Sequence, residues 1–242
     1  MKIEQISNWQ HFENRAFCSN IKYLIVHSFA LSVSEMIDVL NQYKLAVHYI
    51  IDTKGKIIQL VKEDKLAHHA GKSYWNGDEN LNEISIGIEL QNMALGQIIF
   101  PEEQMSSFKL LAKRIIKKHK ILPHNILGHS DVAPTRKVDP GKYFPWADLA
   151  KDGIGIWTDD TLKNKNPDIK RLLQKIGYDV QDEKAALYAF IRHFMPSEMP
   201  CEQNIYQMEE NLLSKIDKYE MPTGIIVDRL TAIANLYDQA RK

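Results

Sequence analysis

The sequence lacks several features that would place it quickly in a class. None of its apolar runs approaches the roughly 20 residues that a membrane-spanning helix needs. Its 31 basic and 31 acidic residues give a formal net charge of zero, which removes any global electrostatic argument for nucleic-acid binding. The start, Met1-Lys2-Ile3-Glu4-Gln5-Ile6, contains no apolar signal core, so the protein stays inside, is exported by another route, or has a signal that this sequence omits.

Cysteine is also scarce. Cys18 and Cys201 lie far apart and fit no paired metal motif, which predicts two free thiols rather than a disulfide framework. The chain nevertheless has enough apolar material to fold, because 44% of its 242 residues are hydrophobic and 9% are aromatic. This length suits one large domain or two modest ones.

Alternating strand and helix patterns occupy the first part of the chain. Apolar or alternating runs predict strands at 21–27, 46–51, 56–61, 84–90 and 125–128. A capping-box pattern at Ser32 precedes one predicted helix, and Pro101 precedes a second. The polar segment 64–82 is expected to be a long surface loop. A sheet with helices packed on it is therefore predicted for residues 1–155.

No strand pattern recurs after the connector at 151–155. Helical spacing of apolar residues predicts helices at 166–177, 182–196, 202–219 and 223–239. The sequence thus predicts an α/β domain at 1–155 and a small all-α domain at 156–242, here called the helical tail.

Residues with metal-binding side chains stand where apolar segments stop. His27 and His129 end two predicted strands, and Asp139 lies in the loop after the second. Two imidazoles and a carboxylate suit zinc, and three protein ligands leave one position open for catalysis. Glu89 and Lys137 could line the same cleft. Taken singly, such histidines more often pack or cap strands and such a glutamate is usually solvated, so spacing alone leaves a zinc site and ordinary packing both open.

Four ordered stretches between residues 20 and 146 carry a more specific signal. They are Val26-His27-Ser28, Val47-His48-Tyr49-Ile50-Ile51-Asp52, Ala67-His68-His69-Ala70-Gly71 through Ser85-Ile86-Gly87-Ile88-Glu89, and Gly128-His129-Ser130-Asp131-Val132-Ala133-Pro134-Thr135-Arg136-Lys137-Val138-Asp139-Pro140-Gly141 with Phe144-Pro145-Trp146. Together they resemble the signature of the zinc-dependent N-acetylmuramoyl-L-alanine amidases of type 2. These peptidoglycan amidases are related to phage amidase-type lysozymes and to peptidoglycan recognition proteins.

The resemblance implies a central mixed β-sheet flanked by helices and hydrolysis of the bond between N-acetylmuramic acid and L-alanine. It implies that His27, His129 and Asp139 bind one zinc ion per chain. Glu89 matches the family's acid/base, and Lys137 matches its lysine beside the metal, which would stabilise the oxyanion. Peptidoglycan and its muropeptides are the expected partners. Nothing in the sequence points to nucleic acid, a membrane span or a particular oligomeric state.

Three further residues are expected to contact substrate. His69 matches a substrate-cleft histidine of the family, with a loop anchor as the alternative. Trp75, expected to be exposed, could stack on a sugar ring or stem peptide, or pack a lid. Arg136 could bind a stem-peptide carboxylate, or form a surface salt bridge. His48, inside a strand pattern, is interpreted as a satisfied core histidine.

The helical tail also resembles a known module. Residues 165–196, with Leu172-Leu173-Gln174-Lys175-Ile176-Gly177-Tyr178-Asp179-Val180 and Ala189-Phe190-Ile191-Arg192-His193-Phe194, are similar to the three-helix peptidoglycan-binding domain appended to some of these amidases. The alternative is a helical module that only stabilises the amidase part. The tail favours a broad-specificity, wall-associated amidase in the periplasm or outside the cell. The alternatives are a cytoplasmic amidase that recycles anhydro-muropeptides and a non-catalytic peptidoglycan-binding protein.

Overall fold

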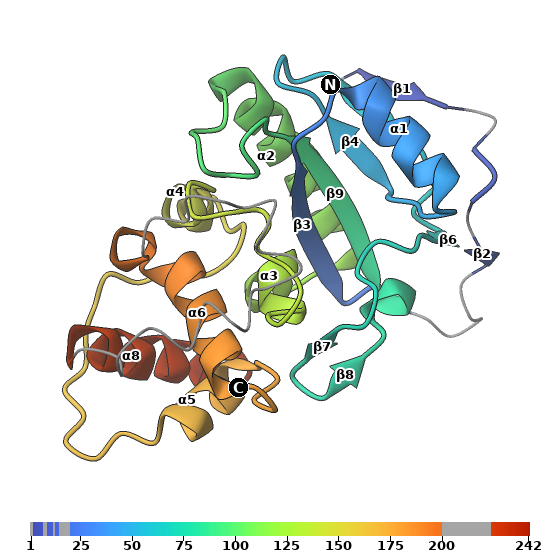
Figure 1. Cartoon of the computed structure of the whole chain (residues 1–242). Coiled ribbons are helices and arrows are strands. Elements are labelled where there is room, and N and C mark those ends of the chain that lie inside the picture. Colours follow the sequence, from blue (N-terminus) through green and yellow to red (C-terminus); the bar gives the residue numbers. More distant parts are fainter. Residues whose placement is uncertain (1, 7–8, 12, 15–19, 200–223) are drawn as a thin grey trace.

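A six-stranded sheet forms the centre of the computed structural model, which describes residues 2–6, 9–11, 13–14, 20–199 and 224–242 (Figure 1). The strand order is β1-β5-β4-β9-β3-β10. These strands are β1 (Ile3–Gln5), β3 (Tyr23–Phe29), β4 (Tyr49–Ile51), β5 (Ile57–Gln59), β9 (Ser85–Gln91) and β10 (Ile126–Gly128). Only β4 and β5 pair antiparallel in this sheet, so the expected mixed sheet is confirmed.

Two amphipathic helices cover opposite faces of the sheet. The helix α1 (Val33–Gln42) begins at the predicted capping box of Ser32 and Glu35, and its apolar side packs with Ile50 and Ile58. The helix α2 (Glu102–His119) packs with the opposite set of strand residues, which includes Leu24 and Ile88. The strands and helices predicted for this part are confirmed. They could be predicted because the hydrophobic pattern of each element depends only on its own residues.

Short elements surround the sheet. They are β2 (Glu13–Asn14) paired with β6 (Lys65–Leu66), β7 (Tyr74–Trp75) paired with β8 (Asp78–Glu79), the helices α3 (His129–Val132) and α4 (Trp146–Lys151), and 3₁₀ turns at Leu81–Ile84, Pro123–Asn125 and Pro196–Glu198. The prediction of a plain surface loop at 64–82 is wrong. The segment contains three of these short strands, and the side chains of Leu66, Ala70 and Trp75 are buried.

The helical tail lies against the sheet through a common core. Its described helices are α5 (Ile169–Ile176), α6 (Glu183–Phe194) and α8 (Gly224–Ala240), which confirms three predicted helices. The predicted helix at 202–219 and both cysteines lie outside the described residues. Ile25 and Leu127 of the sheet share one apolar cluster with Leu173, Phe190 and Leu230 of the tail. The division at residue 155 stays a prediction, and the core extends across it.

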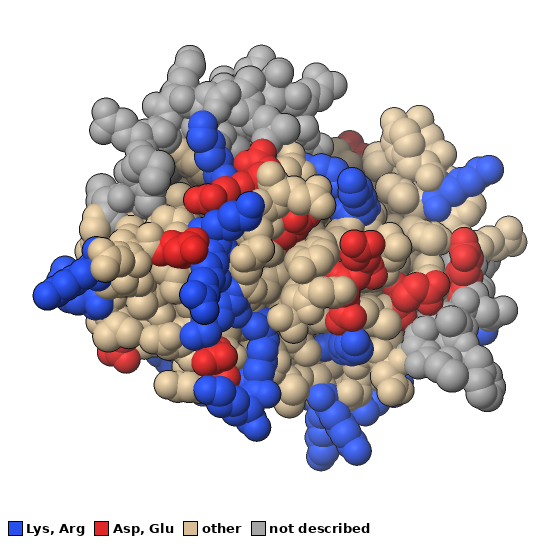
Figure 2. Space-filling model, turned by 90° about the horizontal axis from the view of Figure 1, so that it is seen from below, with Lys and Arg blue, Asp and Glu red and all other residues tan. Residues whose placement is uncertain are grey.

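Figure 2 shows a band of basic side chains on the face seen from below, with acidic side chains on both sides of it. Both signs of charge are therefore present on this face (Figure 2). Within the described residues, none of the helices combines the length and the apolar character needed to cross a bilayer.

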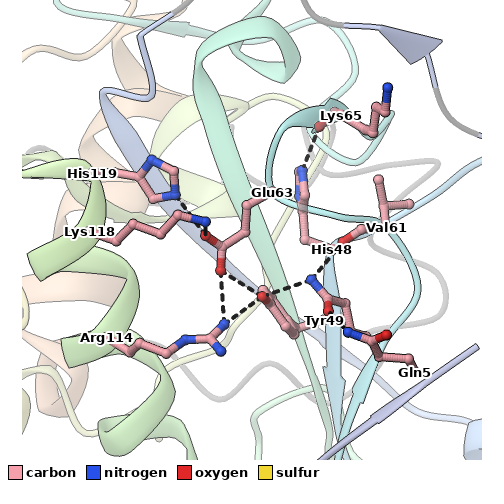
Figure 3. Close-up of polar contacts among 10 residues, drawn as sticks. Gln5, His48, Tyr49, Val61, Glu63, Lys65, Arg114, Lys118 and His119 are labelled. Atoms are coloured by element: carbon pink, nitrogen blue, oxygen red, sulfur yellow. Dashed lines mark hydrogen bonds and ion pairs between the residues drawn. The ribbon is translucent and has the colours of Figure 1, made fainter.

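A buried carboxylate ties α2 to the sheet (Figure 3). Glu63 accepts hydrogen bonds from the Tyr49 hydroxyl at 2.6 Å and from Arg114 at 2.9 Å, and it pairs with Lys118 at 2.7 Å and His119 at 2.8 Å. Burial alone would raise the pKa of Glu63, but the hydrogen bonds from His119, Lys118 and Tyr49 outweigh it and hold that pKa well below its ordinary value. This cluster contributes stability away from the site described next.

Candidate metal centre and catalytic cleft

Two neighbouring parallel strands and the loop after α3 bring the three predicted ligands together. His27 lies in β3, and His129 follows β10, whose last residue, Gly128, is paired with Val26. The loop after α3 returns Asp139 to the same place. His27 Nδ1 lies 2.9 Å from His129 Nδ1, and Asp139 Oδ2 lies 3.4 Å from the first nitrogen and 3.1 Å from the second. All three residues are buried, so these donors converge on one point.

The chemistry of these donors fits a metal. Burial and then the charge of His129 lower the pKa of His27 to about 4, which leaves its imidazole neutral at physiological pH. Burial would raise the pKa of Asp139, but His129 and His27 hold it well below its ordinary value, so the carboxylate is ionised. Two imidazoles and one carboxylate are a known donor set for catalytic zinc. The residues present therefore fit the metal that the resemblance implies.

The outer nitrogen of His27 is held by His69. His27 Nε2 lies 3.0 Å from His69 Nδ1, and His69 Nε2 lies 3.3 Å from the Ser85 hydroxyl. The His69 ring rests on Gly87, where a Cβ would come within 2.6 Å of it. Such outer partners fix which nitrogen faces a metal. The structure thus gives His69 an orienting contact, and its contact with substrate remains a prediction.

Glu89 stands beside the ligands in the neighbouring strand. β9 and β3 pair with Glu89 opposite His27, so both side chains point to the same face. Its Oε2 is buried without a hydrogen-bond partner in the described part of the chain. Burial first, and then the charge of Asp139, raise the pKa of Glu89 well above its ordinary value, while Lys137 opposes this shift. A divalent cation bound nearby would also lower it.

A cavity of about 730 Å³ opens over these groups. Glu89, His129, Lys137 and Asp139 line it, together with residues of α1. Arg136 also lines the cavity, and it donates hydrogen bonds to the carbonyl oxygens of residues 70 and 72 at 3.0 and 2.6 Å. Arg136 therefore joins the loop carrying His69 to the loop carrying Asp139, and its contact with a substrate carboxylate stays a prediction.

The expectation that Trp75 is exposed is wrong. Its side chain is 0% exposed, and its ring lies 4.8 Å from the Tyr178 ring and 6.1 Å from the Tyr237 ring, centroid to centroid. A fully buried indole presents no face to a sugar, so the packing alternative fits this structure. The interpretation of His48 is confirmed, because Gly87 N–H and the Lys65 carbonyl occupy its two ring nitrogens.

Asp131 is a buried residue that the sequence analysis missed. It lies two positions after His129, and its carboxylate accepts a hydrogen bond from Gly128 N–H at 2.7 Å. An acidic residue three positions after a strand end is a usual cap for the first turn of a helix, and this spacing was a local signal. Its other partners come from the distant helical tail, and no local pattern points to them.

Comparison with known proteins identifies the family of this chain. Residues 18–142 match the family model of N-acetylmuramoyl-L-alanine amidase. The amidase AmiD of Escherichia coli is 34% identical over 209 residues, which cover 73% of this chain and 76% of AmiD. AmiD has been solved in complex with the substrate anhydro-N-acetylmuramic acid-L-Ala-D-gamma-Glu-L-Lys. That structure resembles this chain with a TM-score of 0.67 and 33% sequence identity, over 77% of this chain and 86% of the solved one.

A second solved structure extends the likeness into the helical tail. AmpDh3 of Pseudomonas aeruginosa is similar over 98% of this chain and 100% of its own, with a TM-score of 0.74 and 26% identity. The three predicted ligands, Glu89 and Lys137 all lie within the range that matches the family model, and their roles stay predictions. Sequence and fold agree over most of the chain, and it belongs to the N-acetylmuramoyl-L-alanine amidase family.

Proposed function

We propose that this amidase uses one zinc ion to hydrolyse the bond between N-acetylmuramic acid and L-alanine, in intact peptidoglycan as well as in soluble muropeptides. The observation that carries the proposal is the convergence of His27, His129 and Asp139 next to Glu89, whose Oε2 has no hydrogen-bond partner among the described residues and which lines the same cavity as His129 and Asp139. The relative AmiD has been solved with an anhydro-muropeptide substrate, which supports the same class of substrate here.

The three ligands would hold the metal through His27 Nδ1, a ring nitrogen of His129 and the Asp139 carboxylate. When bound, zinc supplies Lewis-acid chemistry, which polarises a carbonyl group and makes water a stronger acid at neutral pH. The hydrogen bond between His27 and His69 keeps His27 Nδ1 facing the other two ligands.

Glu89 would move the protons. Its Oε2 takes a proton from the attacking water as the water oxygen bonds to the lactyl carbonyl carbon, and it later donates that proton to the departing L-alanine nitrogen as the amide bond breaks. Burial raises the pKa of Glu89, whereas Lys137 and a bound cation would lower it, and this balance suits a carboxylate that accepts the proton in one step and gives it up in the next. The Lys137 ammonium, close enough to oppose that shift, would stabilise the negative charge that develops on the carbonyl oxygen.

The helical tail would hold the enzyme on the cell wall. A groove of about 670 Å³ lies between α5, the β7–β8 hairpin and the loop 132–136, and it shares Arg136 with the catalytic cleft. Basic and acidic side chains both line it, namely Lys72, Lys170, Glu79, Asp179 and Asp182. Such a groove suits a peptide that carries both signs of charge. A second contact with a polymer raises the effective concentration of substrate at the first.

Side-by-side digestion separates this proposal from its rivals. Intact sacculi and purified anhydro-muropeptides are incubated with zinc-loaded protein, with and without a chelator, and released stem peptides are identified by mass spectrometry. We expect metal-dependent release from both substrates. Release from the soluble substrate alone would favour a recycling amidase, and zinc-loaded protein that binds sacculi without release would favour a binding protein.

The same proposal places the enzyme in the cell envelope, periplasmic or secreted, where intact wall is accessible. The alternative is the cytoplasm, where only recycled fragments are available. Fractionation of the source cells, followed by immunoblotting against this chain, distinguishes the two compartments. Recovery in the cytoplasmic fraction alone would contradict the envelope assignment.

A further inference from the structure

A single buried carboxylate joins the ligand-bearing segment to the helical tail. Asp131 is 1% exposed and uses both oxygens. Oδ2 accepts from Gly128 N–H at 2.7 Å and lies 2.8 Å from His193 Nδ1 on α6, while Oδ1 accepts from the Tyr178 hydroxyl at 2.8 Å. Figure 1 shows α3, which carries Asp131 and His129, between the sheet and α6.

The two tail partners are fixed by their own packing. The His193 ring is stacked between Trp146 and Phe194, with centroids 4.0 Å away on each side and interplanar angles of 14° and 13°. The Tyr178 ring packs edge-on against the buried Trp75. A hydrogen bond to a side chain that cannot change rotamer constrains its partner, so Asp131 has little freedom to move.

Movement of Asp131 would be transmitted to the ligands. Gly128 N–H, which bonds to Asp131, directly precedes His129, and Ser130 N–H donates to the Asp139 carbonyl at 2.8 Å. A Cβ at Gly128 would lie 2.8 Å from Pro140 Cδ, so the two ligand-bearing segments touch here. Residues 128–131 therefore combine three features. His129 is a predicted metal ligand, Ser130 N–H bonds to the backbone of the ligand Asp139, and the Asp131 carboxylate bonds to the tail.

We propose that Asp131 is a positioning residue through which Tyr178 and His193 of the helical tail hold the metal ligands in place. The inference rests on the proposed zinc site, and it makes the tail part of that site's support in addition to any role on the wall. Partners beyond the ligands typically change metal affinity by 10- to 100-fold when removed. Because each anchor here acts through Asp131 and the backbone, we expect about 10-fold for each.

The test uses the full chain and measures metal binding. Tyr178→Phe removes one hydroxyl and keeps the ring on Trp75, while His193→Phe keeps an aromatic ring between its two neighbours. Zinc dissociation constants come from competition with a chromogenic chelator, and ligand geometry comes from the visible absorption spectrum of the Co²⁺-substituted protein. We expect about 10-fold weaker zinc binding and an altered Co²⁺ spectrum for each variant.

A matched control separates positioning from general stability. Asp228→Asn breaks the ion pair with Lys163, at 2.6 Å, and neither of these residues is among the hydrogen-bond partners of Asp131 in the described part of the chain. It is expected to lower the thermal midpoint while zinc affinity and the Co²⁺ spectrum remain as in the wild type. Equal zinc affinity and an unchanged spectrum in Tyr178→Phe and His193→Phe would overturn the inference, and so would an equal loss in Asp228→Asn. Failure of the wild type itself to bind zinc would instead refute the zinc site.

Discussion

The buried indole of Trp75 gives a sharp test of how the helical tail is joined to the sheet. Trp75→Ala would leave a cavity among Tyr178, Tyr237 and the start of β3, in the core common to both parts. Truncation of a buried tryptophan costs about 3–5 kcal/mol of unfolding free energy, which for a chain of this size lowers the melting midpoint by about 6–20 °C. Trp75→Phe should cost much less, because the Trp75 Nε1 has no hydrogen-bond partner in the described residues to lose.

The assay combines stability with kinetics. Thermal and urea unfolding report the free energies, and KM for an anhydro-muropeptide is measured well below every transition. We expect a large loss of stability and an unchanged KM for Trp75→Ala. Tyr74→Ala, at the half-buried neighbouring position, is the control and should change stability little. A Trp75→Ala enzyme with wild-type stability and a several-fold higher KM would refute the packing argument and restore a substrate role for Trp75.

Four further outcomes are expected. Glu89→Gln should lower kcat by about 10²- to 10⁴-fold with zinc still bound, as measured by release of stem peptide and by metal analysis. Lys137→Ala should lower turnover by about 10²-fold or more, and unchanged turnover with zinc bound would remove its oxyanion role. Gly87→Ala forces a Cβ within 2.6 Å of the His69 ring and should cost about 1–3 kcal/mol in urea unfolding. The pKa of Glu63 is lower in the folded than in the unfolded state, so the stability that it contributes is fully present above the unfolded pKa and is lost as pH falls. Glu63→Gln should therefore unfold more easily than the wild type at pH 7, and the difference in unfolding free energy should shrink in acid.

Local patterns predicted most of the amidase part. The capping box at Ser32 marks the start of α1, and the strict alternation of 84–90 places Glu89 on the face opposite to the residues packed on α2. The ligands could be assigned because His27 and His129 belong to motifs whose order the family shares. The strand register places these residues together. Parallel pairing of β3 with β9 and β10 brings His27, Glu89 and His129 side by side.

Burial that depends on distant partners could not be predicted. The segment 64–82 is polar in composition, and Trp75 is buried by Tyr178 and Tyr237, which lie about a hundred or more positions further along the chain. The same is true of Asp131, for which the sequence offered no sign of its distant partners Tyr178 and His193. Secondary-structure periodicity says which face of an element is apolar, but not which other element will cover it.

The contacts of the helical tail support a structural role beside its proposed role in wall binding. A wall-binding module needs only an exposed surface and a tether, whereas this tail covers Ile25 and Leu127 on the site's face of the sheet and bonds to Asp131 beside a ligand. Aromatic side chains at such a junction bury about 150–250 Å² each, worth several kcal/mol at about 25 cal/mol per Å². The junction between the tail and the sheet is therefore part of the hydrophobic core, because exposing it would cost several kcal/mol of unfolding free energy. Changes at Tyr178 or His193 should therefore reach the metal ligands through Asp131, whereas a change at Lys170 in the groove should affect the proposed wall binding alone.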